Sequence, residues 1–125
     1  MKQSRILVID DSTTNIVLLE AILTEKNYLI ETALNAREAF ARIEKQIPDL
    51  ILLDLLMPKV SGFDFLAQLR QNEKTKKTPV IVISAINTDD ENAKRIKDLE
   101  AVDFLRKPID IQYLVNKVGE ILNEK

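Results

Sequence analysis

Short apolar segments alternate with helical stretches along the whole chain. The segments at 5–9 and 50–53 are nearly continuous apolar runs, the pattern of strands that are buried on both faces. Between such segments, apolar residues recur at three-to-four spacing, as on the buried face of a helix. We expect strands at 5–9, 28–32, 50–53, 80–83 and 101–105, and helices after residue 12, at 36–45, at 63–70, from a capping box at 88–91 to about 99, and at 109–122.

This alternation predicts an α/β fold built on one parallel sheet. Parallel neighbours need crossover helices, and right-handed crossovers place those helices on both faces of the sheet. Five strands are too few to close an eight-stranded barrel, so we expect an open, doubly wound sheet in the flavodoxin-like order 2-1-3-4-5. Linkers and internal repeats are missing from the sequence, and we expect residues 1–125 to form a single domain without an output domain.

The composition excludes several classes of functional site. Cysteine and histidine are absent, which removes disulfides, zinc–thiolate sites, thiol nucleophiles and the commonest general base. The two glycines, Gly62 and Gly119, can form neither a phosphate-binding P-loop nor a dinucleotide fingerprint. The reactive side chains that remain are those of Asp, Glu, Lys, Ser and Thr, which suit chemistry assisted by a hard metal ion.

The charge and hydropathy patterns set expectations for partners and compartment. Eighteen basic and twenty acidic residues leave a net charge of -2, so no general attraction for nucleic acid is expected. No apolar run reaches the roughly 18 residues that a membrane span needs. The first apolar run ends in two acids, unlike a secretory signal. We expect a cytoplasmic protein that binds neither membrane nor nucleic acid directly.

Chemically active side chains stand where the predicted strands end. Asp10 and Asp11 follow the first strand, Asp54 the third, Ser84 the fourth, and Lys107 comes just after the fifth. In the expected strand order the first and third strands are neighbours at the switch point, where such sheets bind ligands. The three carboxylates would repel one another there unless a cation joined them. Oxygen ligands of this kind hold Mg²⁺, and a lysine with a hydroxyl beside it suits phosphoryl transfer.

Four motifs together resemble the receiver domain of response regulators. They are ILVIDD at 6–11, PDLILLDLLMP at 48–58 with Gly62, SA at 84–85, and DFLRKP at 103–108. The similarity extends over the whole chain, and each motif lies at its expected strand end. The resemblance implies that Asp54 accepts a phosphoryl group from a histidine kinase or a phosphotransfer protein. It also implies a Mg²⁺ site made by Asp10, Asp11, Asp54 and the backbone carbonyl of Leu56.

The same resemblance implies roles for the remaining motif residues. Ser84 would hydrogen-bond one phosphoryl oxygen and Lys107 would pair with another. Phe104 stands at the aromatic switch position, where the ring turns inward as the hydroxyl residue moves. The Lys107–Pro108 bond is usually cis in the family. The downstream target would be a protein that binds the surface made by the fourth helix, fifth strand and fifth helix, roughly residues 88–122, and the first helix would dock the phosphodonor.

One position departs from the family pattern, and two others bear on how long the phosphorylated form lasts. Glu100 stands where relatives usually have a glycine that ends a helix in the left-handed conformation, so we expect the loop after it to take another path. Leu56 and Ile86 occupy positions that influence how water reaches the phosphoryl group in the family. Because both are apolar and cannot orient a hydrolytic water, we expect a long-lived phosphorylated form.

Three functional hypotheses follow from the sequence. The leading one is a phosphorylatable switch, which catalyses only its own phosphorylation and dephosphorylation and is not otherwise an enzyme. The second is a receiver-shaped interaction module that takes no phosphate. The third is an enzyme or flavin carrier on a similar sheet, in which the loop at 12–15 would hold a phosphate, although Asp10 and Asp11 would repel that group.

Overall fold

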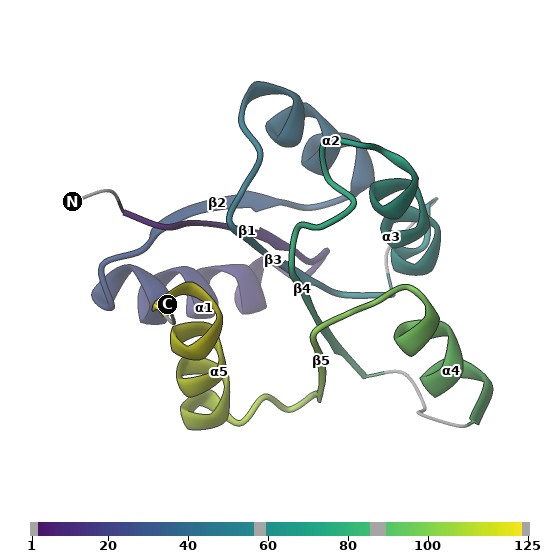
Figure 1. Ribbon diagram of the computed structural model, residues 1–125. Helices are drawn as coiled ribbons and strands as arrows, with labels where there is room; N and C mark the ends of the chain where they lie inside the picture. Colours follow the sequence, from purple (N-terminus) through teal and green to yellow (C-terminus); the bar gives the residue numbers. More distant parts are fainter. Residues whose placement is uncertain (1–2, 57–59, 86–89, 124–125) are drawn as a thin grey trace.

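The computed structural model describes residues 3–56, 60–85 and 90–123 and contains one five-stranded parallel sheet. The strand order is β2-β1-β3-β4-β5, with helices on both faces, which confirms the predicted fold (Figure 1). The strands are β1 (Arg5–Ile9), β2 (Leu29–Ala33), β3 (Leu50–Leu53), β4 (Val80–Ser84) and β5 (Asp103–Arg106). The helices are α1 (Thr13–Glu25), α2 (Ala36–Lys45), α3 (Gly62–Gln71), α4 (Asp90–Asp98) and α5 (Ile111–Asn123).

The sheet separates two apolar cores. Alternate residues of β1 point to opposite faces: Leu7 and Ile9 belong to the core under α2, α3 and α4, whereas Ile6 and Val8 belong to the core under α1 and α5. Figure 1 shows these two groups of helices on opposite sides of the sheet. Both faces of the central strands are therefore covered, as their continuous apolar sequences predicted.

The register of β1 and β3 places two acids at the same height. Ile9 pairs with Leu53 across the parallel ladder, and the next residues along the two strands are Asp10 and Asp54. The N–H of Asp54 donates to the carbonyl of Ile9 at 2.9 Å, so the ladder continues to the first residue beyond β3. The backbone alone thus brings both carboxylates to the carboxyl edge of the sheet.

The helix before β5 ends differently from our expectation. Glu100 adopts the left-handed conformation with φ 60°, and the N–H groups of Glu100 and Ala101 donate to the carbonyls of Lys97 and Ile96. This is the Schellman ending that relatives would build with glycine. The expectation that Glu100 sends this loop along another path is therefore wrong. The two hydrogen bonds that end the helix outweigh the modest cost of placing a Glu in the left-handed conformation.

The start of α3 lies directly against the residues that follow β3. A Cβ atom at Gly62 would stand 2.4 Å from the Cα of Leu55 and 2.7 Å from the carbonyl oxygen of Asp54, closer than real atoms approach. The N–H of Gly62 also donates to the carbonyl of Leu55 at 3.0 Å. Only glycine allows this close approach, which seats α3 on the backbone of the strand-end acid.

One further expectation falls partly outside the described residues. The capping box predicted at 88–91 begins there, and α4 is described from Asp90 onward. Within the described ranges, no helix has both the length and the apolar character needed to cross a membrane.

Candidate functional site

The three predicted acids come together at the carboxyl edge of the sheet. Asp10, Asp11 and Asp54 each offer a carboxylate oxygen, and these oxygens lie within 4.8 Å of one another. Asp10 and Asp54 are almost fully buried, whereas Asp11 is exposed. The cluster predicted from the strand ends is thus confirmed, with two carboxylates held inside the protein and a third at the solvent side.

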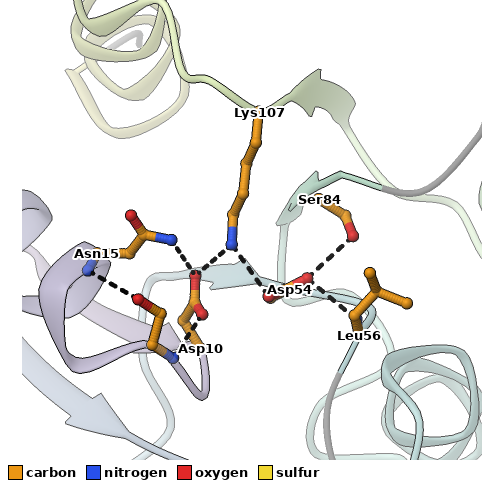
Figure 2. A network of polar contacts seen from close by, with 7 residues as sticks. Asp10, Asn15, Asp54, Leu56, Ser84 and Lys107 are labelled. Carbon is orange, nitrogen blue, oxygen red and sulfur yellow. Dashed lines mark hydrogen bonds and ion pairs between the residues drawn. The ribbon is translucent and has the colours of Figure 1, made fainter.

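Asp54 lies at the centre of a polar network that both of its oxygens enter (Figure 2). Its Oδ1 accepts from the Ser84 hydroxyl at 2.9 Å and from the N–H of Leu56 at 3.0 Å. Its Oδ2 accepts from the Lys107 ammonium at 3.1 Å. Ser84 is itself completely buried, so this hydroxyl is held facing the carboxylate. The network supplies the hydrogen bonds that a buried carboxylate needs in place of water.

Lys107 joins the two buried acids. Its ammonium donates to Asp10 Oδ2 at 2.9 Å and to Asp54 Oδ2 at 3.1 Å. Burial lowers the pKa of Lys107, but the hydrogen bonds and negative charges of Asp10 and Asp54 outweigh that effect and raise the pKa above its ordinary value. The side chain therefore stays a cation at neutral pH and balances one of the carboxylate charges.

Asp10 is oriented by the beginning of α1. The N–H of Ser12 donates to Asp10 Oδ1 at 2.9 Å, and the Asn15 amide reaches Asp10 Oδ2 at 3.5 Å. Ser12 is also the N-cap of α1, where its hydroxyl accepts from the Asn15 N–H. Asn15 was not predicted to take part in the acidic cluster; its place in the first helical turn after the acidic pair was the available signal.

The donor set fits a hard divalent cation. Among the described residues, the cluster holds three carboxylates, two of which pair with the Lys107 ammonium, so acidic groups outnumber the basic group and the available ligand atoms are oxygens. Mg²⁺ prefers such ligands and retains several water molecules, which the exposed position of Asp11 permits. The residues present are therefore able to hold the ion that the sequence predicted.

The other predicted residues lie around this network. The Leu56 side chain is 54% exposed, so an apolar group stands at the rim of the site. Phe104 in β5 is half-buried against the core under α2, α3 and α4, and it is outside the hydrogen-bonded network. The Lys107–Pro108 bond is cis, as the resemblance implied. Met57, Pro58 and Ile86 lie outside the described residues.

Comparisons with known proteins agree on one family. The family model of the response regulator receiver domain matches residues 6–119. The chain is 40% identical over 124 residues to the response regulator PleD of Caulobacter vibrioides. The aligned region is 98% of this chain but only 27% of PleD. The chain is 31% identical to the protein PilH of Pseudomonas aeruginosa, over 95% of this chain and 98% of PilH.

Solved structures show the same likeness. The chemotaxis protein CheY4 of Vibrio cholerae superposes with a TM-score of 0.89 at 29% identity, covering 97% of this chain and 100% of CheY4. A receiver domain protein from Methanospirillum hungatei superposes with a TM-score of 0.90 at 27% identity, covering 98% of this chain and 96% of that one. The chain is therefore similar to response regulators both in sequence and in fold.

Proposed function

The chain belongs to the response regulator receiver domain family, and from that membership we propose that it is a phosphoacceptor switch of two-component signalling. Asp54 is the proposed acceptor of a phosphoryl group from a phosphohistidine donor. The observation that carries this proposal is the buried network in which Asp54 meets Ser84 and Lys107 while Asp10 and Asp11 lie beside it. It combines a nucleophile, charge neutralisation and a hydroxyl donor, which is what phosphoryl transfer requires.

The proposed reaction is a transfer between two side chains. An oxygen of Asp54 forms a bond to phosphorus as the bond between phosphorus and the donor imidazole nitrogen breaks. The electron pair stays on that nitrogen, which takes up a proton. Lys107 can pair with a negatively charged phosphoryl oxygen because its ammonium already contacts Asp54. Ser84 can hydrogen-bond another phosphoryl oxygen once Asp54 Oδ1 is no longer its partner.

Asp10, Asp11, Asp54 and the backbone carbonyl of Leu56 are the proposed Mg²⁺ ligands. Support comes from the 4.8 Å carboxylate cluster. The ion supplies charge neutralisation for the phosphoryl oxygens when it is bound. The protein's own part is to hold Asp10 in place through Ser12 and to keep the acids close despite their repulsion.

The proposed output is a change in the surface formed by α4, β5 and α5. When Ser84 turns toward a phosphoryl group, the space beside it becomes available to Phe104, which lies across from Val82 on the neighbouring strand. The surface to be read by a downstream protein includes Val102 and Tyr113, which are both exposed. This fits a protein target better than a nucleic acid, because the net charge of the chain is -2.

The proposed phosphodonor surface is α1. Val17 and Leu18 are 64% and 46% exposed on this helix, whose first turn contacts Asp10 through Asn15. An apolar helix face next to the acceptor suits docking against the helices of a histidine kinase or phosphotransfer protein, and we propose that this encounter takes place in the cytoplasm. We propose no catalysis beyond the protein's own phosphorylation and dephosphorylation.

Intact mass spectrometry tests the proposed function. The protein is incubated with Mg²⁺ and acetyl phosphate, and a gain of one phosphoryl group is expected for the wild type. Asp54→Asn should abolish that gain, whereas Asp64→Asn, which changes an exposed acid in the first turn of α3, should retain it. A wild-type protein that gains nothing with acetyl phosphate or with a phosphorylated histidine donor would support the interaction module instead.

A further inference from the structure

Helices α3 and α4 are neighbours on the same face of the sheet (Figure 1), and side-chain contacts of two arginines connect them within the part of the chain that the structure describes. The guanidinium of Arg95 in α4 lies over the ring of Phe63 in α3, 3.8 Å from the ring centroid. At the other end, Arg70 of α3 donates from Nε to the carbonyl of Leu99 at 2.9 Å and from Nη2 to the carbonyl of Glu100 at 3.2 Å. We call these two contacts the α3–α4 clamp. They hold α4 near its middle and at its end.

Arg70 is fixed on its other side as well. Its Nη1 reaches the carbonyls of Thr75, Lys76 and Thr78 in the loop between α3 and β4, at 3.3, 3.1 and 2.8 Å. All five acceptors of this guanidinium are backbone carbonyls, so Arg70 joins the end of α4 to the α3–β4 loop. A positive charge at the end of α4 also complements the negative end of the helix dipole.

The clamp is important for α4 because this helix buries little of its own surface. Among its described side chains, Ile96 is the buried one, and the neighbouring Lys94, Arg95 and Lys97 are exposed. A helix with few buried apolar contacts is stabilised mainly by interactions at its ends and along its edges. The position of α4 therefore depends strongly on α3.

Helix α3, in contrast, is firmly attached to the phosphoacceptor strand. Phe65, Leu66 and Leu69 are completely or almost completely buried in the core. Gly62 lies directly against Leu55 and the carbonyl of Asp54. A shift of the backbone at Asp54 therefore has to move the first turn of α3, where Phe63 follows Gly62.

We propose that the α3–α4 clamp is a second route from Asp54 to the output surface, separate from Ser84 and Phe104. In this route Phe63, Arg70 and Arg95 are positioning residues: a change at Asp54 shifts α3 through Gly62, and α3 shifts α4 through the two arginine contacts. The existence of the clamp is independent of phosphorylation, whereas its role as a route rests on the proposed phosphoacceptor function.

Amide hydrogen exchange of α4 in the unphosphorylated protein tests the clamp itself. We expect Arg95→Gln and Phe63→Leu to speed exchange of the α4 amides roughly threefold to fivefold, since each removes the contact between the guanidinium and the ring. Lys94→Gln is the matched control, because it removes a charge from the same helix and an exposed ion pair with Asp98. It should change exchange by no more than about twofold. Equal effects of Arg95→Gln and Lys94→Gln would overturn the clamp.

The same measurement after treatment with acetyl phosphate and Mg²⁺ tests the route. At matched phosphoryl occupancy, read by intact mass, phosphorylation should alter α4 exchange in the wild type and in Lys94→Gln. In Arg95→Gln and Phe63→Leu that response should fall to less than about half, the outcome expected when one of two routes carries much of the coupling. A full response in both variants, or no response of α4 in the wild type, overturns the route. If no protein takes up a phosphoryl group, the proposed function fails and the route with it, while the first measurement still decides the clamp.

Discussion

Asp54 is almost fully buried, but both oxygens of its carboxylate have hydrogen-bond donors: a hydroxyl, an N–H and an ammonium. A buried charge without such partners would be costly. The consequence for function is that any incoming phosphoryl group meets donors that are already oriented. Single residues around Asp54 should therefore change rates and affinities more than they change the fold.

Leu56 should control the lifetime of the phosphorylated form. We expect Leu56→Asn to speed loss of the phosphoryl group about threefold to tenfold, a barrier change of about 0.6–1.4 kcal/mol, because an amide at the rim can orient a water molecule. Loss of mass label over time in Mg²⁺ measures the rate. Leu29→Asn changes another half-exposed leucine, in β2, and should leave the rate unchanged. A wild-type protein that loses its label rapidly would contradict the proposed long lifetime.

Tyr113 should titrate at unusually high pH. Its hydroxyl donates to Asp103 at 2.6 Å, and this hydrogen bond, together with the negative charge of Asp103, raises the pKa of Tyr113 above its ordinary value. This hydrogen bond stabilises the folded state fully below the pKa of tyrosine in the unfolded chain, about 10. Its contribution is lost as pH rises through the pKa of Tyr113 in the folded state. We expect Asp103→Asn to return the pKa of Tyr113 toward the ordinary value.

The ultraviolet absorbance of tyrosinate, followed against pH, measures this shift. The difference between the wild type and Tyr113→Phe isolates Tyr113 from Tyr28. Identical titrations of Tyr113 in the wild type and in Asp103→Asn would show that the hydrogen bond is unimportant in solution.

At the scale of elements, hydrogen bonds at the helix ends explain where the predicted boundaries moved. The predicted start of α5 at 109 became 111, since the Asp110 carboxylate accepts from the Tyr113 N–H and caps the helix. The fifth strand was predicted from 101 and begins at 103, and Ala101 does not join the ladder because its N–H is already used in ending α4. Apolar periodicity identifies an element well, whereas its ends depend on such polar contacts.

The ending of α4 provides a test of backbone strain. Glu100→Gly should raise the free energy of unfolding by about 0.5–1 kcal/mol, because glycine adopts the left-handed conformation without a Cβ penalty. Urea unfolding measures the change. Asn27→Gly is the comparison, since Asn27 has φ 74° in the same kind of helix ending and should gain less, as Asn tolerates this conformation. A destabilised Glu100→Gly would show that the Glu side chain contributes more than the strain costs.

Arg70 should be important for stability as well as for position. We expect Arg70→Met to lower the free energy of unfolding by about 2–3 kcal/mol, because it leaves backbone carbonyls of two loops without a donor. Arg37→Met, at an exposed position in α2, should change it by less than about 0.5 kcal/mol. Equal midpoints for the two variants in urea would contradict the importance of these hydrogen bonds.

For the whole molecule, the topology is what creates a cation site. Asp10 and Asp54 are far apart in sequence and become neighbours because β1 and β3 pair in parallel. Three acids of like charge at one edge weaken the folded state by repulsion, and a bound cation relieves that repulsion. Metal binding should therefore raise the free energy of unfolding of the whole domain.

We expect Mg²⁺ to raise the thermal midpoint. At ten times its dissociation constant the ion should add about 1.4 kcal/mol, a rise of roughly 4–7 °C for a chain of this size. Asp11→Asn should reduce the rise, whereas Asp64→Asn, away from the cluster, should preserve it. Circular dichroism melts with and without Mg²⁺ give the comparison. An equal rise in both variants would place the ion elsewhere.

The sequence by itself determined the elements, the fold class and the acids at the strand ends. These depend on local periodicity and on the rule that parallel strands end at a common edge, so residues such as Asp10 and Asp54 could be placed together before any coordinates. Tertiary structure alone decided that Asn15 reaches Asp10, that Gly62 touches the backbone at Asp54, and that Arg70 and Arg95 connect α3 to α4. Such contacts depend on how helices are rotated and seated against the sheet, and side-chain packing sets that geometry without leaving a periodic signal in the chain.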